Sequence, residues 1–154
     1  MALERFLLLL PLLTILIVNI VSSETPAERF ERQHVDSGHR DLNDNKVYCN
    51  LMMRNRGMTK GSCKQFNTFI LESIWKIRAI CWNTKAPCKT ENSNCHRSRK
   101  LMQVIECRLK GNSKFPHCKY QTMKTKKHII VACHGWPPLP VHLDYSKRDR
   151  GQEQ

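Results

Sequence analysis

The segment Lys64-Gln65-Phe66-Asn67-Thr68-Phe69-Ile70 governs the prediction of the architecture, because the sequence pattern changes around it. It is rich in aromatic and β-branched residues, which favours a strand. Strand geometry would place Lys64, Phe66 and Thr68 on one face. The residues that flank it on both sides are patterned as helices, whereas the second half of the chain is patterned as strands.

Three helices are predicted around this strand. The segment Thr25-Pro26-Ala27-Glu28 has the form of a capping box, with the threonine as N-cap and the proline at the first helical position. The run Val47–Arg56 has helical periodicity, and Gly57 suits its C-terminal cap. The third helix is expected from about Ser73 to Cys81, with Trp75 interpreted as a packing residue.

The second half of the chain predicts an antiparallel sheet. A turn is expected at Gly111-Asn112-Ser113, and the prolines of Trp136–Pro140 are expected to interrupt the ladder before the last strand. Helices followed by strands predict an α+β domain. The predicted strands are Leu101–Leu109, Cys118–Lys124, Ile129–Cys133 and Val141–Tyr145.

The first 23 residues are predicted to be an export signal. Arg5 precedes the apolar run Phe6–Val21, and the small residues Ser22 and Ser23 follow it. A membrane helix is the alternative, since the run is only slightly short of the roughly 20 residues that span a bilayer. A proline and an asparagine interrupt the run and no second apolar run follows, which favours the signal.

Residues 24–154 have the length of one domain. Within them the polar stretch Asp36–Asn45 is typical of a mobile surface loop. The polar tail at residues 148–154 is expected to be disordered.

All eight cysteines lie after the predicted signal. An even number of cysteines in a small exported chain predicts a disulfide framework, although many pairings remain open from the sequence. Zinc is the alternative suggested by Cys95-His96 and Cys133-His134. No CxxC pair occurs and exported thiols tend to oxidise, so neither a metal nor any other cofactor is predicted.

The net charge is strongly positive, with 26 Lys and Arg against 13 Asp and Glu, which gives +13. The predicted signal removes one charge of each sign, so the remaining domain keeps this value. Such a field favours polyanionic partners, namely nucleic acids, anionic glycans or anionic membranes, without separating them.

No histidine can be assigned a role from its own neighbourhood. Ala27, Phe30 and His34 fall on one helix face, which by itself favours a buried face with a hydrogen-bonded histidine. A lysine such as Lys64 is, by itself, most simply a solvated strand residue.

Three segments together resemble the signature segments of the pancreatic ribonuclease superfamily, in the same order. They are Phe30-Glu31-Arg32-Gln33-His34, Cys63–Phe69 and Pro140–Asp144, and the resemblance covers nearly all of the mature chain with every cysteine position. It implies three short helices on a curved antiparallel sheet, two lobes with a central cleft, and four disulfides. Around Asn50–Met53 and Ile74–Arg78 the chain resembles the uridine-preferring ribonuclease four branch.

The resemblance implies acid and base catalysis by two histidines. RNA carries its own nucleophile, the 2′-hydroxyl, which attacks the adjacent phosphorus if a base takes its proton and an acid protonates the leaving oxygen. Histidine suits both tasks because its ordinary pKa is about 6.5. By resemblance His34 is the base, His142 is the acid, and Lys64 stabilises the charge that develops on the phosphoryl group.

Two supporting residues are proposed, one by resemblance and one by its spacing. Gln33 resembles the family's phosphate-contacting glutamine. Asp144 lies two residues after His142 on one strand face, so it is expected to accept a hydrogen bond from the imidazole, with an ordinary surface aspartate as the alternative.

Substrate-binding residues follow from matching positions. Thr68 resembles the threonine that binds the pyrimidine, and Phe66 is either a specificity residue or pocket-wall packing. Arg29 and Lys89 match outer phosphate positions, and Asn94 matches a residue that contacts the base on the leaving side. A glutamate common in the family is replaced by a histidine at position 134, and Leu71 replaces a common histidine.

The family's disulfide pairing, carried over by position, defines the covalent framework of the chain. The expected pairs are Cys49 with Cys107, Cys63 with Cys118, Cys81 with Cys133 and Cys88 with Cys95.

The predicted function is that of a secreted endoribonuclease, monomeric, that cleaves single-stranded RNA after pyrimidines. Cytosolic ribonuclease inhibitor is a partner that the resemblance implies. The alternative is a cationic host-defence protein that acts on anionic membranes, which the charge, Trp82 and Trp136 permit, with nuclease activity incidental. A receptor-binding role is a third option without a direct sequence mark.

Overall fold

The computed structural model describes residues 3–8, 23–38, 47–91 and 93–147, with side chains described up to Asp144. Most of the predicted export signal, most of the predicted loop at residues 36–45 and the tail at 148–154 lie outside the described residues. Residues 3–8 form a short helix, and no helix in the described part is long and apolar enough to cross a membrane.

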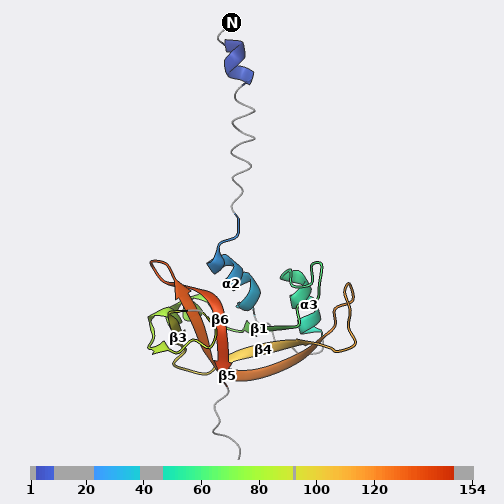
Figure 1. Ribbon diagram of the computed structural model, residues 1–154, viewed down its shortest axis with the longest axis vertical. Helices are drawn as coiled ribbons and strands as arrows, with labels where there is room; N and C mark the ends of the chain where they lie inside the picture. Colours follow the sequence, from blue (N-terminus) through green and yellow to red (C-terminus); the bar gives the residue numbers. More distant parts are fainter. Residues whose placement is uncertain (1–2, 9–22, 39–46, 92, 148–154) are drawn as a thin grey trace, which may run out of the picture.

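The elements form an α+β architecture, as the sequence predicts (Figure 1). In chain order they are α2 Pro26–His34, α3 Tyr48–Asn55, β1 Phe66–Ile70, α4 Ile74–Ala79, the 3₁₀ helix η1 Ile80–Trp82, β2 Lys85–Ala86, β3 Cys95–Arg97, β4 Met102–Leu109, β5 Tyr120–His134 and β6 Leu139–Lys147.

The helix starts and stops follow from local capping. The Thr25 hydroxyl accepts a hydrogen bond from the Glu28 amide at 3.2 Å, and the Glu28 carboxylate accepts one from the Thr25 amide at 2.8 Å, which confirms the capping box of α2. Gly57, after α3, has a φ of +76°, the left-handed conformation that suits a helix end.

The third predicted helix is shorter than expected and changes type. It is α-helical over Ile74–Ala79 and then tightens into η1. The interpretation of Trp75 as a packing residue is wrong, because its side chain is 73% exposed and lies under the Arg78 guanidinium. Ile77 is the residue that α4 buries, so Trp75 occupies the opposite side of a short helix.

The long strand β5 corrects the prediction of two strands, Cys118–Lys124 and Ile129–Cys133. It is one strand from Tyr120 to His134. Its polar middle resembles a break in the sequence, but it is the part where the strand passes from one partner to another. Residues 120–127 pair with β4 and residues 128–134 pair with β6, so one strand continues through the change of partner, and its register shifts lie only in the pairing with β6.

The last strand also begins earlier than predicted. Pro137 and Pro138 lie in the turn, whereas Pro140 lies inside β6 opposite Cys133, next to a register shift in the ladder with β5. β6 pairs only with β5, so it is an edge strand. A proline, which has no N–H to donate, is tolerated on an edge strand because one side of the strand has no ladder partner. The short strands β2 and β3 were not predicted, since two and three residues carry no periodicity.

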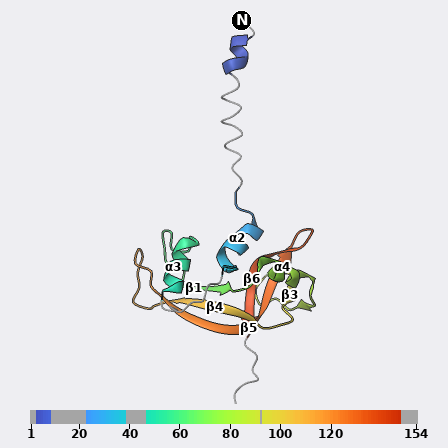
Figure 2. The same cartoon turned by 180° about the vertical axis from the view of Figure 1, so that it is seen from behind.

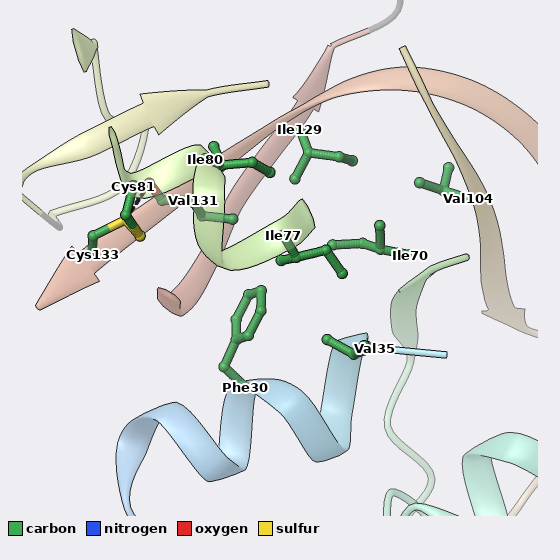
Figure 3. Packing of buried hydrophobic residues seen from close by; sticks show 10 residues of the cluster. All are labelled: Phe30, Val35, Ile70, Ile77, Ile80, Cys81, Val104, Ile129, Val131 and Cys133. Carbon is green, nitrogen blue, oxygen red and sulfur yellow. Dashed lines mark hydrogen bonds between the residues drawn. A yellow bond between two sulfur atoms is a disulfide. The ribbon is translucent and has the colours of Figure 1, made fainter. Parts of the chain in front are cut away.

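The two larger hydrophobic clusters divide the domain into two lobes, which share β5. One lies between α2, α4 and the β5–β6 half of the sheet, where the Phe30 ring points toward Ile77 (Figure 3). The other lies under α3, where Met53, Phe69 and Tyr120 pack together. Seen from behind, α4 closes the first lobe beside β3 (Figure 2).

The covalent framework agrees in full with the pairing implied by the resemblance. The four disulfides are Cys49–Cys107, Cys63–Cys118, Cys81–Cys133 and Cys88–Cys95. Together they use all eight cysteines of the chain, so no thiolate is left as a ligand for zinc.

Candidate active site

His34 ends α2 at the junction of the two lobes. Phe30, one turn earlier, is buried in the first core and its ring centroid lies 5.3 Å from that of His34. The His34 Nδ1 atom lies 2.9 Å from the Thr68 carbonyl oxygen of β1. A carbonyl only accepts, so Nδ1 carries the hydrogen and Nε2 is the nitrogen that can accept a proton.

The surroundings of His34 favour its neutral form. Burial lowers the pKa of His34 to about 4, although the hydrogen bond to the Thr68 carbonyl acts in the opposite direction. The positive charges of Lys64 and of His142 lower the pKa further. The structure therefore brings the three predicted catalytic residues into one electrostatic neighbourhood.

Lys64 precedes β1, so strand alternation does not position its side chain. Hydrogen bonds hold the residue instead. Its Nζ donates to the Asn67 Oδ1 at 3.1 Å, and its carbonyl accepts from the Tyr120 hydroxyl at 2.7 Å. Burial, and then the positive charge of Arg32, lower the pKa of Lys64.

Asn67 is a site residue that the sequence reasoning missed. It is 2% exposed, and its Nδ2 donates to the Gln33 carbonyl at 2.8 Å while its Oδ1 accepts from Lys64. It thus fixes the end of α2 and the predicted catalytic lysine, Lys64, to the same strand. The signal available in the sequence was an asparagine inside an otherwise apolar strand, where a buried polar group needs partners.

Replacing Asn67 by alanine is expected to lower kcat about tenfold, because Lys64 loses the acceptor that orients it. The free energy of unfolding should fall by about 1–3 kcal/mol. Asn50→Ala is the matched control, since Asn50 accepts from the Tyr120 amide and does not contact the lysine side chain. Steady-state kinetics and urea unfolding should show a loss of stability in both variants and a loss of kcat only in the first.

His142 lies on β6, opposite Ala132 of β5, and its side chain is exposed. α2 packs against β6, which brings the strand that carries His142 to the helix that carries His34. An exposed imidazole in this position can exchange protons with substrate and water.

The expected hydrogen bond between His142 and Asp144 is replaced by others. The Asp144 carboxylate accepts from the Lys89 amide at 2.6 Å and from the Thr90 amide at 3.1 Å, and it also bonds to the Thr90 hydroxyl. Partial burial raises the pKa of Asp144, but these hydrogen bonds and the charge of His142 outweigh it and lower the pKa overall. Asp144 thus ties β6 to the Cys88–Cys95 loop.

Thr68 and Phe66 lie on β1 with different surroundings. Thr68 is 3% exposed and lies opposite Glu106 of β4. Phe66 is 41% exposed, with the Arg108 guanidinium 5.4 Å from its ring centroid. A hollow of about 500 Å³ beside Phe66 is lined by Gln65, Phe66, Arg108, Leu109, Lys110, Gly111 and Ser113. These contacts fit Phe66 as a wall residue and leave its specificity role a prediction.

The predicted phosphate contacts differ in exposure and in their partners. Arg29 is exposed on α2 and pairs with Glu24 at 3.6 Å. Gln33 is half-buried, and its backbone carbonyl accepts from Asn67. Lys89 is exposed in the Cys88–Cys95 loop, where its backbone amide binds Asp144.

The Asn94 side chain is held by one contact with β5 and by one contact with a neighbouring histidine. Its Nδ2 donates to the Cys133 carbonyl at 3.1 Å, and its Oδ1 lies 3.1 Å from the His96 Nε2. His134, the residue that replaces the common glutamate, follows Cys133 and is exposed. Of the two predicted leaving-side residues, Asn94 therefore directly precedes β3 and His134 ends the neighbouring strand β5.

Comparison with known proteins agrees with this arrangement. The family model described as pancreatic ribonuclease matches residues 25–144. A pancreatic ribonuclease of Acomys cahirinus is 49% identical over 149 residues, which cover 95% of this chain and 99% of the relative. That of Gerbillus nigeriae is 48% identical with the same coverage of both chains, and a gamma-type pancreatic ribonuclease of Rattus norvegicus is 44% identical over 152 residues, again with this coverage. On this similarity, the chain belongs to the pancreatic ribonuclease family.

Proposed function

We propose that the protein is an endoribonuclease that cleaves single-stranded RNA after pyrimidines, through a 2′,3′-cyclic phosphate. The observation that carries the proposal is the state of His34, which lies near His142 and Lys64. Its Nδ1 is bound by the Thr68 carbonyl, and burial lowers its pKa. A neutral base, a second histidine and a fixed ammonium are the groups that the reaction needs. The names of the family relatives state a ribonuclease activity.

In the first step, His34 Nε2 takes the proton of the 2′-hydroxyl, and the 2′-oxygen forms a bond to phosphorus. The Lys64 ammonium donates to the phosphoryl oxygens, on which negative charge develops. The bond between phosphorus and the 5′-oxygen breaks, and the His142 imidazolium gives that oxygen its proton. The products are a 2′,3′-cyclic phosphate and a free 5′-hydroxyl.

In the second step the roles are exchanged. His142, now neutral, takes a proton from water, whose oxygen bonds to phosphorus. His34, now protonated, gives a proton to the departing 2′-oxygen, which leaves a 3′-phosphate. Both histidines return to their starting states, so the residues alone balance the protons of the proposed cycle.

Base choice and secretion belong to the same proposal. The Thr68 hydroxyl can donate or accept, so it suits both cytosine and uracil, and Phe66 would bias the choice toward uridine. Residues 1–23 would direct export, which fits a domain whose cysteines are all in disulfides. The protein would act as a monomer outside the cell, with ribonuclease inhibitor as a binding partner in the cytosol.

The test is steady-state cleavage of uridine and cytidine dinucleotides with a common leaving nucleoside, by the mature protein in the presence of a chelator. A cyclic phosphate should appear before the 3′-phosphate, and uridine should be preferred. Cleavage after purines at comparable rates would refute the specificity. Turnover no greater than that of His142→Ala would refute the proposed activity itself.

A second candidate, action on anionic membranes, is favoured by the tryptophans. All three are exposed: Trp75 by 73%, Trp82 by 60% and Trp136 by 86%. Trp82 and Trp136 form an edge-to-face pair, and exposed tryptophans beside cations suit a lipid interface. Leakage of vesicles rich in anionic lipid should persist in His142→Ala and fall in Trp82→Ser/Trp136→Ser. Leakage unchanged by the double substitution would exclude this surface.

A further inference from the structure

The buried histidine His96 of β3 has a hydrogen-bond pattern that the proposed reaction does not use. It is 7% exposed. Its Nδ1 lies 2.7 Å from the backbone carbonyl of Asn83, and its Nε2 lies 3.1 Å from the side-chain oxygen of Asn94. Both neighbours present an oxygen to the ring.

The orientation of the Asn94 carboxamide follows from its contact with the backbone carbonyl of Cys133. The Cys133 carbonyl oxygen can only accept, so the Asn94 group that faces it at 3.1 Å must be the NH₂. The Asn94 backbone carbonyl also accepts from the Cys133 amide at 3.1 Å, which holds the residue in place. Oδ1 is therefore the atom turned toward His96.

The protonation of His96 follows from these contacts. Carbonyl and amide oxygens only accept, so both contacts are hydrogen bonds only if both ring nitrogens carry hydrogen. The fully bonded state is the imidazolium. Loss of the Nε2 proton would place a lone pair against the Asn94 Oδ1, and turning the carboxamide to correct this would break its bond to Cys133.

The outer side of Asn94 is what a ligand would meet. The side chain is exposed, and each of its polar atoms has used one bonding position. One N–H of Nδ2 and one lone pair of Oδ1 remain for a ligand. A carboxamide presented in this way is the group that pairs with adenine through two hydrogen bonds.

We infer that protonated His96 is a positioning residue that fixes the Asn94 carboxamide for adenine on the leaving side, so that leaving-side base choice depends on pH. The inference rests on the proposed function, in which Asn94 contacts the base after the cleaved bond. Adenine preference is highest while His96 is protonated and falls as rising pH removes the Nε2 proton.

Lys85 of β2 is the charged residue directly opposite His96 in the strand register. Arg97 follows His96 on β3, so its side chain points to the other face of the sheet. From β5 the register partner is Val131, which is uncharged, and His134 lies just beyond Cys133. From β6, the Asp144 carboxylate lies within 4.8 Å of the Cys95 sulfur. Residues Ile80–Trp82 of η1 carry no charge.

The test uses two dinucleotides, uridylyl-adenosine and uridylyl-cytidine, between pH 5 and pH 8, the range in which histidine ordinarily titrates. The ratio of their kcat/KM values cancels the titration of His34 and His142, because both substrates need the same catalytic groups. The ratio should fall about tenfold with rising pH in the wild type. A ratio independent of pH would overturn the inference.

His96→Gln separates positioning from titration. Glutamine can donate one hydrogen bond to Asn94 Oδ1 but does not titrate, so its ratio should be independent of pH. His117→Gln is the matched control: it removes an exposed histidine that lies outside the site, in the β4–β5 connection, and should keep the pH dependence. A wild-type pH dependence in His96→Gln, or its loss in His117→Gln, would assign the effect elsewhere.

Two further measurements keep the outcomes distinct. Asn94→Ala should lower the ratio, and an unchanged ratio would refute the proposed role of Asn94 itself. Nitrogen-15 NMR of the wild-type histidine rings needs no variant and no turnover. It should show both nitrogens of His96 protonated at the pH of highest adenine preference, and an unprotonated Nε2 there would refute the positioning role even if the enzyme is active.

Discussion

Replacing either His34 or His142 by alanine is expected to lower kcat/KM for a uridine dinucleotide by about 100-fold to 10,000-fold, the range for a general acid or base. In His34→Ala the base is lost, and the Thr68 carbonyl loses its partner at 2.9 Å. In His142→Ala the acid is lost from an exposed strand position. The double variant should lose much less than the product of the two effects, because the residues act as a unit.

His117→Ala is the control for these variants. His117 is exposed in the β4–β5 connection, away from α2 and β6, so its loss should leave kcat/KM unchanged. His142→Ala and His117→Ala should unfold at the denaturant concentration of the wild type, whereas His34→Ala should unfold at a lower one because the buried Thr68 carbonyl loses its partner; urea titration would check both. A comparable loss in His117→Ala, or wild-type activity in His142→Ala, would contradict the proposed roles.

The pH profile of kcat/KM is an independent test of His34 as the general base. The base must be neutral in the free enzyme, and burial lowers its pKa from 6.5 to about 4. Activity should therefore persist as the pH falls below 6.5 and be lost only as His34 takes up a proton. In His34→Ala this acidic limb should disappear. An acidic limb centred above pH 6.5 would contradict the burial of the base.

The parts of the fold that could be predicted are those fixed by local rules. The capping box at Thr25 and the cap at Gly57 are read from neighbouring residues, and the structure has both. The disulfides could not be chosen from spacing, and only the family resemblance gave the pairing that the structure confirms. Local chemistry thus determined where helices start and stop, whereas the long-range pairing needed comparison.

The misassigned elements are those in which tertiary contacts override the pattern. The polar middle of β5 resembled a break because Lys127 lies in it, yet this lysine is 9% exposed. Trp75 resembled a core residue because tryptophan is apolar, yet α4 is too short to bury two sides. Neither outcome could be read from periodicity, since each depends on which neighbouring strand or helix covers the position.

The site divides in a similar way. The identities of His34, Lys64 and His142 came from signature segments, while the contacts that position them did not. Asn67 lacks an ionisable group and so drew no attention, although it links the lysine to α2. Spacing placed Asp144 near His142, but it could not show that a distant loop would take its hydrogen bonds.

The buried ion pair between Lys127 and Glu106 is the basis of the second large effect. Glu106 lies on β4 and Lys127 on β5, and both residues are less than 10% exposed. Lys127→Met is expected to reduce the free energy of unfolding by about 3–5 kcal/mol, because it leaves the Glu106 carboxylate buried without its partner. Urea unfolding with the disulfides intact would measure it. Lys76→Met is the matched control, since its pair with Glu72 is exposed and should contribute at most about 1 kcal/mol.

Replacing both partners separates the cost of an unpaired charge from the value of the pair. In Glu106→Met/Lys127→Met no charge remains buried, so most of the stability lost in Lys127→Met should return. If the double variant is as unstable as the single one, packing or register in β5 is what the lysine provides, and the ion pair is not the cause. Glu106 lies opposite Thr68, so kcat/KM of the double variant also shows whether this charge influences the base-binding strand. Recovered stability with altered uridine preference would place the pair in substrate selection as well as in the fold.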